Sequence, residues 1–143
     1  MLQSRNRLAL VSLVLAAFSI TSCSSGGGDS NGGGLPASTE LTTSIVEYQF
    51  TPDTWKVPAG EQITITITND GALQHEWVLL QDGVRITTEA EFEEGFVNVE
   101  QEVAPGETQT LTFEAPPAGT YQVICAIPGH FDAGLQGVLN SEG

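Results

Sequence analysis

The sequence is short of the side chains that most often carry catalysis or bind anions. Its 143 residues include two histidines, two cysteines, one methionine and four basic residues, against 18 acidic residues. So few Lys and Arg residues argue against nucleic acid or an anionic membrane surface as a partner. Two histidines are also too few for a catalytic centre that needs several imidazole ligands, so we expect a protein that is not an enzyme.

A hydrophobic run long enough to span a membrane is absent too. The N-terminal apolar run covers residues 8–20, and thirteen helical residues span about 20 Å, less than the roughly 30 Å of a bilayer core. Because basic residues precede this run, residues 1–22 are typical of a signal peptide. The residues Ile-Thr-Ser-Cys at its end resemble a bacterial lipoprotein box, which predicts lipidation of Cys23. The alternative is cleavage near this point that leaves Cys23 as a free thiol.

The next segment offers almost nothing that could enter a core. Residues 23–40 are rich in Gly and Ser, which predicts a flexible tether with a reach of about 20–25 Å. We therefore expect one folded domain over residues 41–143, exported and held by a lipid anchor at the periplasmic or cell-surface face of a membrane. The anchor would be its only contact with lipid.

Charge is distributed unevenly along the chain. All 18 acidic residues but only two basic ones, Lys56 and Arg85, follow Cys23, a formal charge of −16. Such a surface would steer a basic partner protein towards the domain. A saline habitat explains the acidity equally well, because exported proteins of such organisms are often acidic.

The domain sequence alternates as β-strands do. In residues 62–69, Ile63, Ile65 and Ile67 fall on one face and threonines on the other. Six further runs are β-rich: residues 41–50, 75–80, 96–103, 107–114, 119–127 and 136–140. Gly- or Pro-containing turns separate the runs. This pattern predicts an all-β, two-sheet Greek-key β-sandwich of seven or eight strands.

Other parts of the domain sequence are less specific. Residues 87–96 are expected to form a loop or a single helical piece. Trp55 and Trp77 are expected to pack in the core or at its rim.

The scarce histidines and cysteines gather near the strand ends. His75 opens one predicted strand, Cys125 ends another, and His130 follows in a loop that contains a Pro-Gly corner. A thiolate and two imidazoles form a soft nitrogen–sulfur ligand set, which suits copper or zinc. Each residue alone has an ordinary structural explanation, but together they predict a metal site.

The stretch CAIPGHFDAGL, residues 125–135, is followed by QGVL and preceded by YQVI, with His75 upstream. In these features the chain resembles the blue copper proteins, or cupredoxins, of the azurin, auracyanin and plastocyanin group, over residues 46–140. The resemblance implies a cupredoxin-like fold and one type 1 copper ion, bound by His75, Cys125 and His130. It also implies that the carbonyl of Gln74 lies below the plane of these ligands.

Two positions depart from that family's pattern. Leu135 stands where cupredoxins usually have a weak axial Met, and leucine cannot coordinate, which favours Cu(I). The next residue, Gln136, could be an axial ligand only if a bulge turned it inward, because strand neighbours point to opposite faces. Glu76 follows the first histidine where many cupredoxins have Asn. Its charge would stabilise Cu(II) and so oppose the effect of Leu135, or its side chain simply points to solvent.

Three functions remain open on the sequence. The first is a membrane-tethered electron carrier outside the cytoplasm, monomeric, that meets redox partners with basic docking surfaces through an apolar rim around His130. We expect that rim to comprise Leu73, Ile127, Pro128, Phe131, Ala133 and Leu135. The second is a copper donor, buffer or sensor with a Cu(I)-preferring site. The third is a metal-free structural or interaction module.

Overall fold

The computed structural model describes residues 36–143. The predicted signal peptide, Cys23 and most of the predicted tether lie outside these residues, so they stay predictions. Within the described part of the chain, no helix is both long enough and apolar enough to cross a bilayer.

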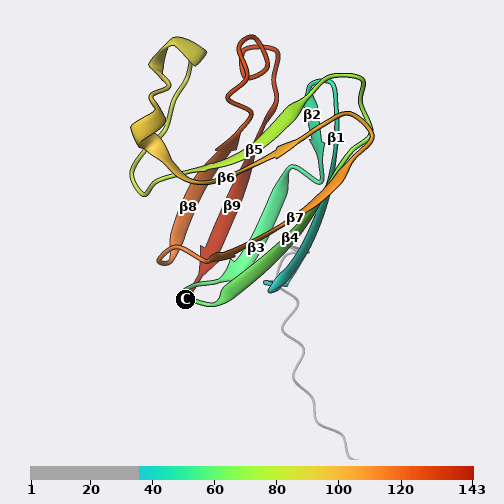
Figure 1. The fold of residues 1–143 in the computed structure, drawn as a ribbon. Helices are drawn as coiled ribbons and strands as arrows, with labels where there is room; N and C mark the ends of the chain where they lie inside the picture. The colour runs from blue at the N-terminus through green and yellow to red at the C-terminus, as the bar shows by residue number, and fades with distance from the viewer. Residues whose placement is uncertain (1–35) are drawn as a thin grey trace, which may run out of the picture. The chain divides into compact units, whose positions relative to one another are not determined.

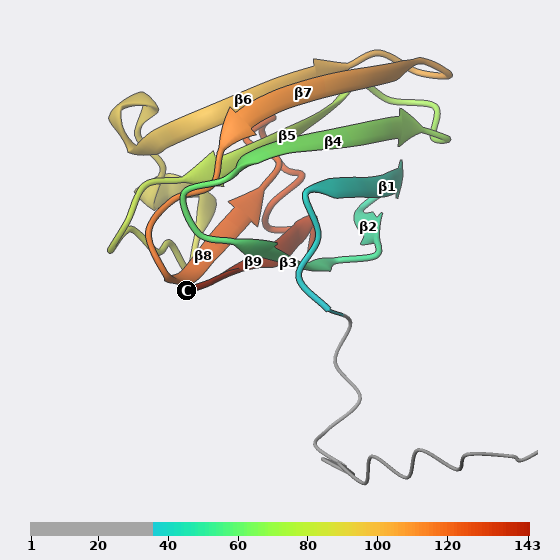
Figure 2. The same cartoon turned by 90° about the horizontal axis from the view of Figure 1, so that it is seen from below.

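Residues 36–143 form nine strands and two short 3-10 helices (Figure 1). The strands are β1 (Glu40–Val46), β2 (Gln49–Thr51), β3 (Thr54–Pro58), β4 (Gln62–Asn69), β5 (His75–Leu80), β6 (Val97–Val103), β7 (Thr108–Glu114), β8 (Gly119–Ile124) and β9 (Gln136–Glu142). One sheet has the order β2-β1-β4-β7 and the other β3-β9-β8-β5-β6. Seen from below, β1 and β4 of the first sheet lie over β3, β8 and β9 of the second (Figure 2). The predicted all-β two-sheet sandwich is confirmed.

The nine strands exceed the expected seven or eight for two local reasons. Residues 41–50 form two strands, β1 and β2, because a turn at Glu47 and Tyr48 reverses the chain. Residues 54–58 form β3, which pairs in parallel with β9 and is not among the runs predicted from the sequence. Residues 87–96 contain two 3-10 helices, η1 (Glu89–Glu91) and η2 (Glu94–Phe96), in place of one helical piece.

The core lies between the sheets and follows the alternation read from the sequence. Ile63, Ile65 and Ile67 of β4 are fully buried, and each such side chain contributes roughly 1.5–3 kcal/mol on leaving water. They belong to one cluster with Trp55 and Trp77, whose rings meet edge to face at 5.8 Å. Both tryptophans are therefore core residues.

A second apolar cluster covers the outer face of the five-stranded sheet. It comprises Val78, Leu80, Ile86, Ile124 and Phe131, with Val84, Phe92, Phe96, Val97 and Ala126 packed against it. Most of the latter come from the long connection between β5 and β6, so the apolar side chains of that connection pack on the sheet. The cluster also fixes Phe131, which belongs to the loop that carries His130.

Candidate metal centre

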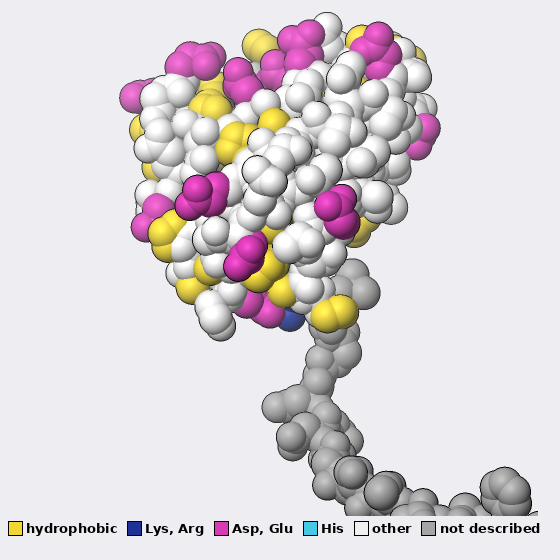
Figure 3. Space-filling model, turned by 60° about the horizontal axis from the view of Figure 1, so that its bottom comes forward, with side chains coloured by type: hydrophobic (Ala, Val, Ile, Leu, Met, Phe, Trp, Pro, Cys, Tyr) yellow, Lys and Arg dark blue, Asp and Glu magenta, His cyan; other side chains and the backbone are white. Residues whose placement is uncertain are grey.

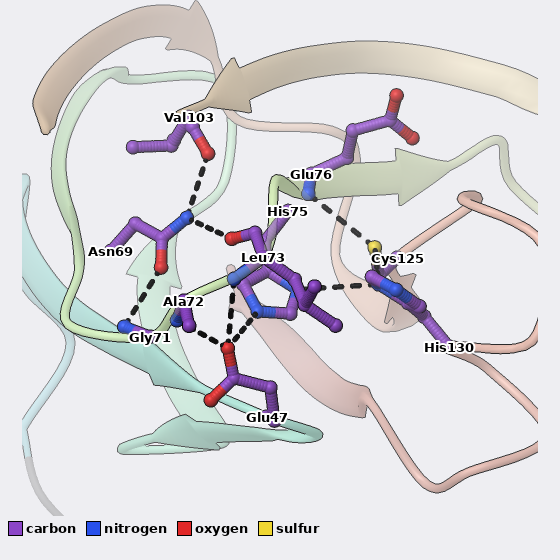
Figure 4. A network of polar contacts seen from close by, with 10 residues as sticks. All are labelled: Glu47, Asn69, Gly71, Ala72, Leu73, His75, Glu76, Val103, Cys125 and His130. Atoms are coloured by element: carbon purple, nitrogen blue, oxygen red, sulfur yellow. Dashed lines mark hydrogen bonds and ion pairs between the residues drawn. The ribbon is translucent and has the colours of Figure 1, made fainter. Parts of the chain in front are cut away.

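His75 is positioned by the turn that leads from β4 into β5. The buried side chain of Asn69 organises this turn: its Nδ2 donates to the carbonyls of Leu73 and Val103, each at 2.8 Å. Its Oδ1 accepts a hydrogen bond from the amide of Gly71 at 3.0 Å. One side chain therefore bonds two groups of the turn, the Gly71 amide and the Leu73 carbonyl, and ties the turn to Val103 of β6, so the chain enters β5 in a fixed direction (Figure 4). The His75 side chain is fully buried.

Cys125 follows directly after β8. This strand pairs antiparallel with β5, with Val78 opposite Ile124, which brings the cysteine beside the start of β5. The amide of Glu76 accordingly points at the cysteine sulfur, with an N–Sγ distance of 3.4 Å. The amide of Cys125 donates to the carbonyl of Leu135 at 3.1 Å, so the first and last residues of the ligand-bearing loop are tied together.

His130 lies in that loop, residues 125–135, which folds back on itself. The His130 amide donates to the carbonyl of Ile127, and the His130 carbonyl accepts from the amide of Leu135, each at 3.0 Å. Gly129 has a φ of 87°, in the left-handed region that glycine adopts at little cost. The Pro-Gly corner therefore turns the chain so that the histidine ring faces back towards Cys125.

The three side chains form one buried cluster. His75 Nδ1 lies 3.2 Å from His130 Nδ1, and Cys125 Sγ lies 3.4 Å from the same atom. One donor atom from each residue falls within 4.8 Å of the others, and all three residues are buried. Ligands that bind one ion through metal–nitrogen and metal–sulfur bonds of about 2.0 and 2.3 Å would be separated by distances of this size. The donor set and its spacing therefore fit one soft metal ion.

The domain also matches a family as a whole. The family model for the cupredoxin-like domain matches residues 10–139. The chain belongs to the cupredoxin-like domain family.

Individual cupredoxins match over most of their length. Auracyanin-A of Chloroflexus aurantiacus is 32% identical over 153 aligned residues, which cover 91% of this chain and 94% of that protein. The solved structure of auracyanin A, described as a "blue" copper protein, matches with a TM-score of 0.57 and 31% identity, covering 72% of this chain and 99% of the other. A reduced auracyanin from Roseiflexus castenholzii matches with a TM-score of 0.67 and 26% identity, covering 76% of this chain and all of the other.

The protonation of Cys125 and His75 follows from their burial. Desolvation raises the pKa of the Cys125 thiol to about 11, although the amides of Ile127 and Glu76 act in the opposite direction. Burial also lowers the pKa of His75, and the neighbouring His130 lowers it further. At neutral pH the site therefore holds a protonated thiol and a neutral His75 imidazole, and a metal ion that bound there would displace the thiol proton.

The position expected for an axial ligand offers no donor. Leu135 is fully buried and belongs to the same core cluster as Cys125. Gln136 starts β9, and its Oε1 accepts a hydrogen bond from Nε2 of Gln122 at 3.2 Å. Because Gln122 also bonds Ile86 on the outer side of the sheet, Gln136 points away from Cys125, as strand alternation predicts. The role of the Gln74 carbonyl stays a prediction.

The backbone and the side chain of Glu76 point in different directions. Its amide donates towards Cys125, whereas its carboxylate points away from the sulfur (Figure 4). Partial burial raises the pKa of this carboxyl, and the carboxylates of Glu100 and Glu102 on β6 raise it further. The backbone of Glu76 thus links the segment that carries His75 to the segment that carries Cys125.

The sequence reading missed the turn between β1 and β2, which contacts both histidines. Oε1 of Glu47 lies 3.8 Å from Nε2 of His75. The ring of Tyr48 meets the ring of His130 edge-on, with centroids 5.1 Å apart. No local pattern could reveal these contacts, because they join residues far apart in the sequence.

The sequence also did not predict the hydrogen bonds that hold the 125–135 loop against η1, which we call the brace. The amide of Gly129 donates to Oε2 of Glu89 at 2.6 Å, and the amide of Glu89 donates to Oδ1 of Asp132 at 3.0 Å. The short helix η1 and the loop are therefore joined by two hydrogen bonds, one donated by the loop and one donated by the helix. The acidic segment 87–96, for which the sequence predicted no role, therefore forms hydrogen bonds to residues on both sides of His130.

Proposed function

We propose that this protein is an exported type 1 copper protein that carries single electrons between redox partner proteins. The observation that carries the proposal is the convergence of His75 Nδ1, Cys125 Sγ and His130 Nδ1 in one buried pocket. The similarity to auracyanin A, itself described as a "blue" copper protein, supports copper as the ion.

A copper ion in such a site exchanges one electron by alternating between Cu(II) and Cu(I). The chain contributes a pocket that holds its shape. Asn69 fixes the turn before His75, and the bonds within the 125–135 loop fix His130. Leu135 supplies no fourth donor, which favours Cu(I) and a high reduction potential. The carboxylates of Glu47 and Glu76 act against this, because negative charge near the ion favours Cu(II).

The surface for electron exchange lies at the end of the sandwich where the two histidines sit. The large hydrophobic side chains exposed in residues 36–143 are Val46, Tyr48 and Leu73, at 47%, 37% and 43% exposure. All three flank the histidines, since Val46 and Tyr48 border Glu47 and Leu73 precedes His75 by two residues. A small apolar surface suits a transient redox contact.

This surface differs from the rim expected from the sequence. Leu73, Pro128 and Ala133 are exposed as expected, and Ile127 is partly buried. Phe131 and Leu135 are buried, because they pack into the outer and inner clusters of the five-stranded sheet. They cannot touch a partner, and Val46 and Tyr48 take their place.

The partner's docking surface would be basic. Asp and Glu side chains spread over the face shown in Figure 3, where Lys and Arg are scarce. Of the two cations in the domain, Lys56 is already paired with Glu142 at 3.0 Å. We further propose export by residues 1–22, anchoring through lipid on Cys23 and a monomeric state.

Copper binding followed by visible absorption distinguishes the electron carrier from a copper-handling protein and from a metal-free module. Residues 36–143 would be produced, given one equivalent of Cu(II), and followed by visible absorption through reduction and reoxidation. An intense blue band that bleaches and returns supports the electron carrier. Tight binding of Cu(I) without that band would indicate copper handling, and failure to bind either ion would indicate a structural module.

The Cys125→Ser variant tests the ligand assignment. Removal of the thiolate should abolish the blue band, while the small polar replacement leaves the sandwich folded, as judged by circular dichroism. Ser141→Ala is a matched control, because it alters one buried small side chain at the far end of β9. A Cys125→Ser protein that stays blue would contradict the site.

A further inference from the structure

The carboxylate of Glu47 is held in a defined place beside His75. Its Oε1 accepts hydrogen bonds from the amides of Ala72 and Leu73, the latter at 2.9 Å. These amides belong to the turn that delivers His75 into β5. The same oxygen lies 3.8 Å from His75 Nε2, so one atom contacts both the turn and the ring (Figure 4).

His75 Nε2 is a buried polar atom that lacks a hydrogen-bond partner at bonding distance. The ring is fully buried, so water does not satisfy this atom from the surface. The other ring nitrogen, Nδ1, already faces His130 and Cys125. A buried imidazole N–H requires an acceptor, and the Glu47 carboxylate is the acidic group within 4.0 Å of Nε2.

We infer that Glu47 is a positioning residue for His75. Its carboxylate accepts a hydrogen bond from Nε2–H, which keeps the proton on Nε2 and leaves the Nδ1 lone pair free for the metal ion. Metal-binding histidines commonly donate their second ring N–H to a carboxylate, which fixes both the tautomer and the ring orientation. A hydrogen bond needs a separation of about 2.7–3.2 Å. The carboxylate oxygen and Nε2, now 3.8 Å apart, therefore need to approach each other by about 1 Å or less. That the ion is copper rests on the proposed function, whereas the predicted tautomer of His75 does not depend on it.

A purely structural role for Glu47, as an acceptor for the turn amides, predicts different results. It would affect the stability of the turn but not the position of a proton on the ring. The test therefore reads the tautomer directly, by nitrogen-15 NMR of the metal-free domain, residues 36–143. His75 should carry its proton on Nε2 in the unsubstituted protein and lose this preference in Glu47→Ala.

A second variant covers the possibility that Glu47→Ala fails to fold. Glu47→Gln keeps an oxygen that can accept from the turn amides and from the ring, but removes the charge. With copper bound, its reduction potential should rise by more than in Glu114→Gln, which removes an equal charge at the opposite end of the four-stranded sheet. Glu47→Ala should also lose roughly 10–100-fold in copper affinity.

The outcomes separate this inference from the proposed function. A His75 ring protonated on Nδ1 in the unsubstituted protein, or a tautomer unchanged in Glu47→Ala, overturns the positioning role even if the site is blue. Equal shifts in potential for Glu47→Gln and Glu114→Gln also overturn it. A colourless protein with the expected tautomer change would overturn the copper function and leave the role of Glu47 intact.

Discussion

At the scale of single residues, Leu135 stands where the resemblance to cupredoxins predicts a weak axial Met. Its side chain fills the core beside Cys125 and offers no lone pair. A site of this kind would bind its ion through three strong donors, with an apolar side chain in place of a fourth. The reduction potential would therefore be set mainly by the three donors and by nearby charges, among them the carboxylate of Glu47, 3.8 Å from the His75 ring.

Leu135→Met would restore a weak donor at this position. The swap nearly conserves volume, so it should cost less than about 1.5 kcal/mol of folding free energy. The thioether would stabilise Cu(II) relative to Cu(I), and the reduction potential should fall by roughly tens of millivolts, measured by voltammetry. Leu139→Met, a buried leucine four residues along β9, is the matched control. A potential equally changed in both variants would argue against an axial position at Leu135.

At the scale of elements, the loop that carries His130 depends on the neighbouring helix η1. Glu89→Ala removes the acceptor for the Gly129 amide. The free energy of unfolding should fall by about 1 kcal/mol, because one largely exposed hydrogen bond is lost. The Gly129 amide should also exchange severalfold faster with deuterium, measured by NMR.

Glu93→Ala is the control for that element, because it removes a nearby exposed carboxylate of equal charge. It should leave the exchange of the Gly129 amide unchanged. If both variants exchange alike, the brace between η1 and the loop does not determine the loop's stability.

The elements divide into those that the sequence predicts and those that it does not. The strands with strict alternation, such as β4, were predictable because one face of each is buried. Strands β2 and β3 were not, since three or five residues hold too little periodic signal and β3 depends on pairing with β9. Likewise, His75, Cys125 and His130 stand out by their rarity and spacing, whereas Glu47 acquires its place only through the β1–β2 turn.

At the scale of the whole molecule, the acidic surface predicts how the rate of electron transfer depends on salt. With a cationic metal complex as oxidant, the rate should fall by roughly tenfold or more as ionic strength rises from about 0.01 to 0.15 M, because the Debye length shrinks from about 30 to 8 Å. An anionic complex of similar potential is the control, and its rate should rise. Stopped-flow absorption measures both. Equal salt dependence for the two complexes would exclude electrostatic steering.

The course of β1 has a consequence for how the molecule would be oriented. Glu40 pairs with Thr64 and Ile45 with Asn69, so β1 starts at the end of the sandwich opposite the histidines and finishes beside them. At about 3.3 Å per residue, its seven residues place the chain's entry roughly 20 Å from the site. A molecule fastened to an electrode by its N-terminal side would stand with the copper end facing the solution. It would exchange electrons slowly with the electrode beneath it and readily with a mediator that diffuses freely.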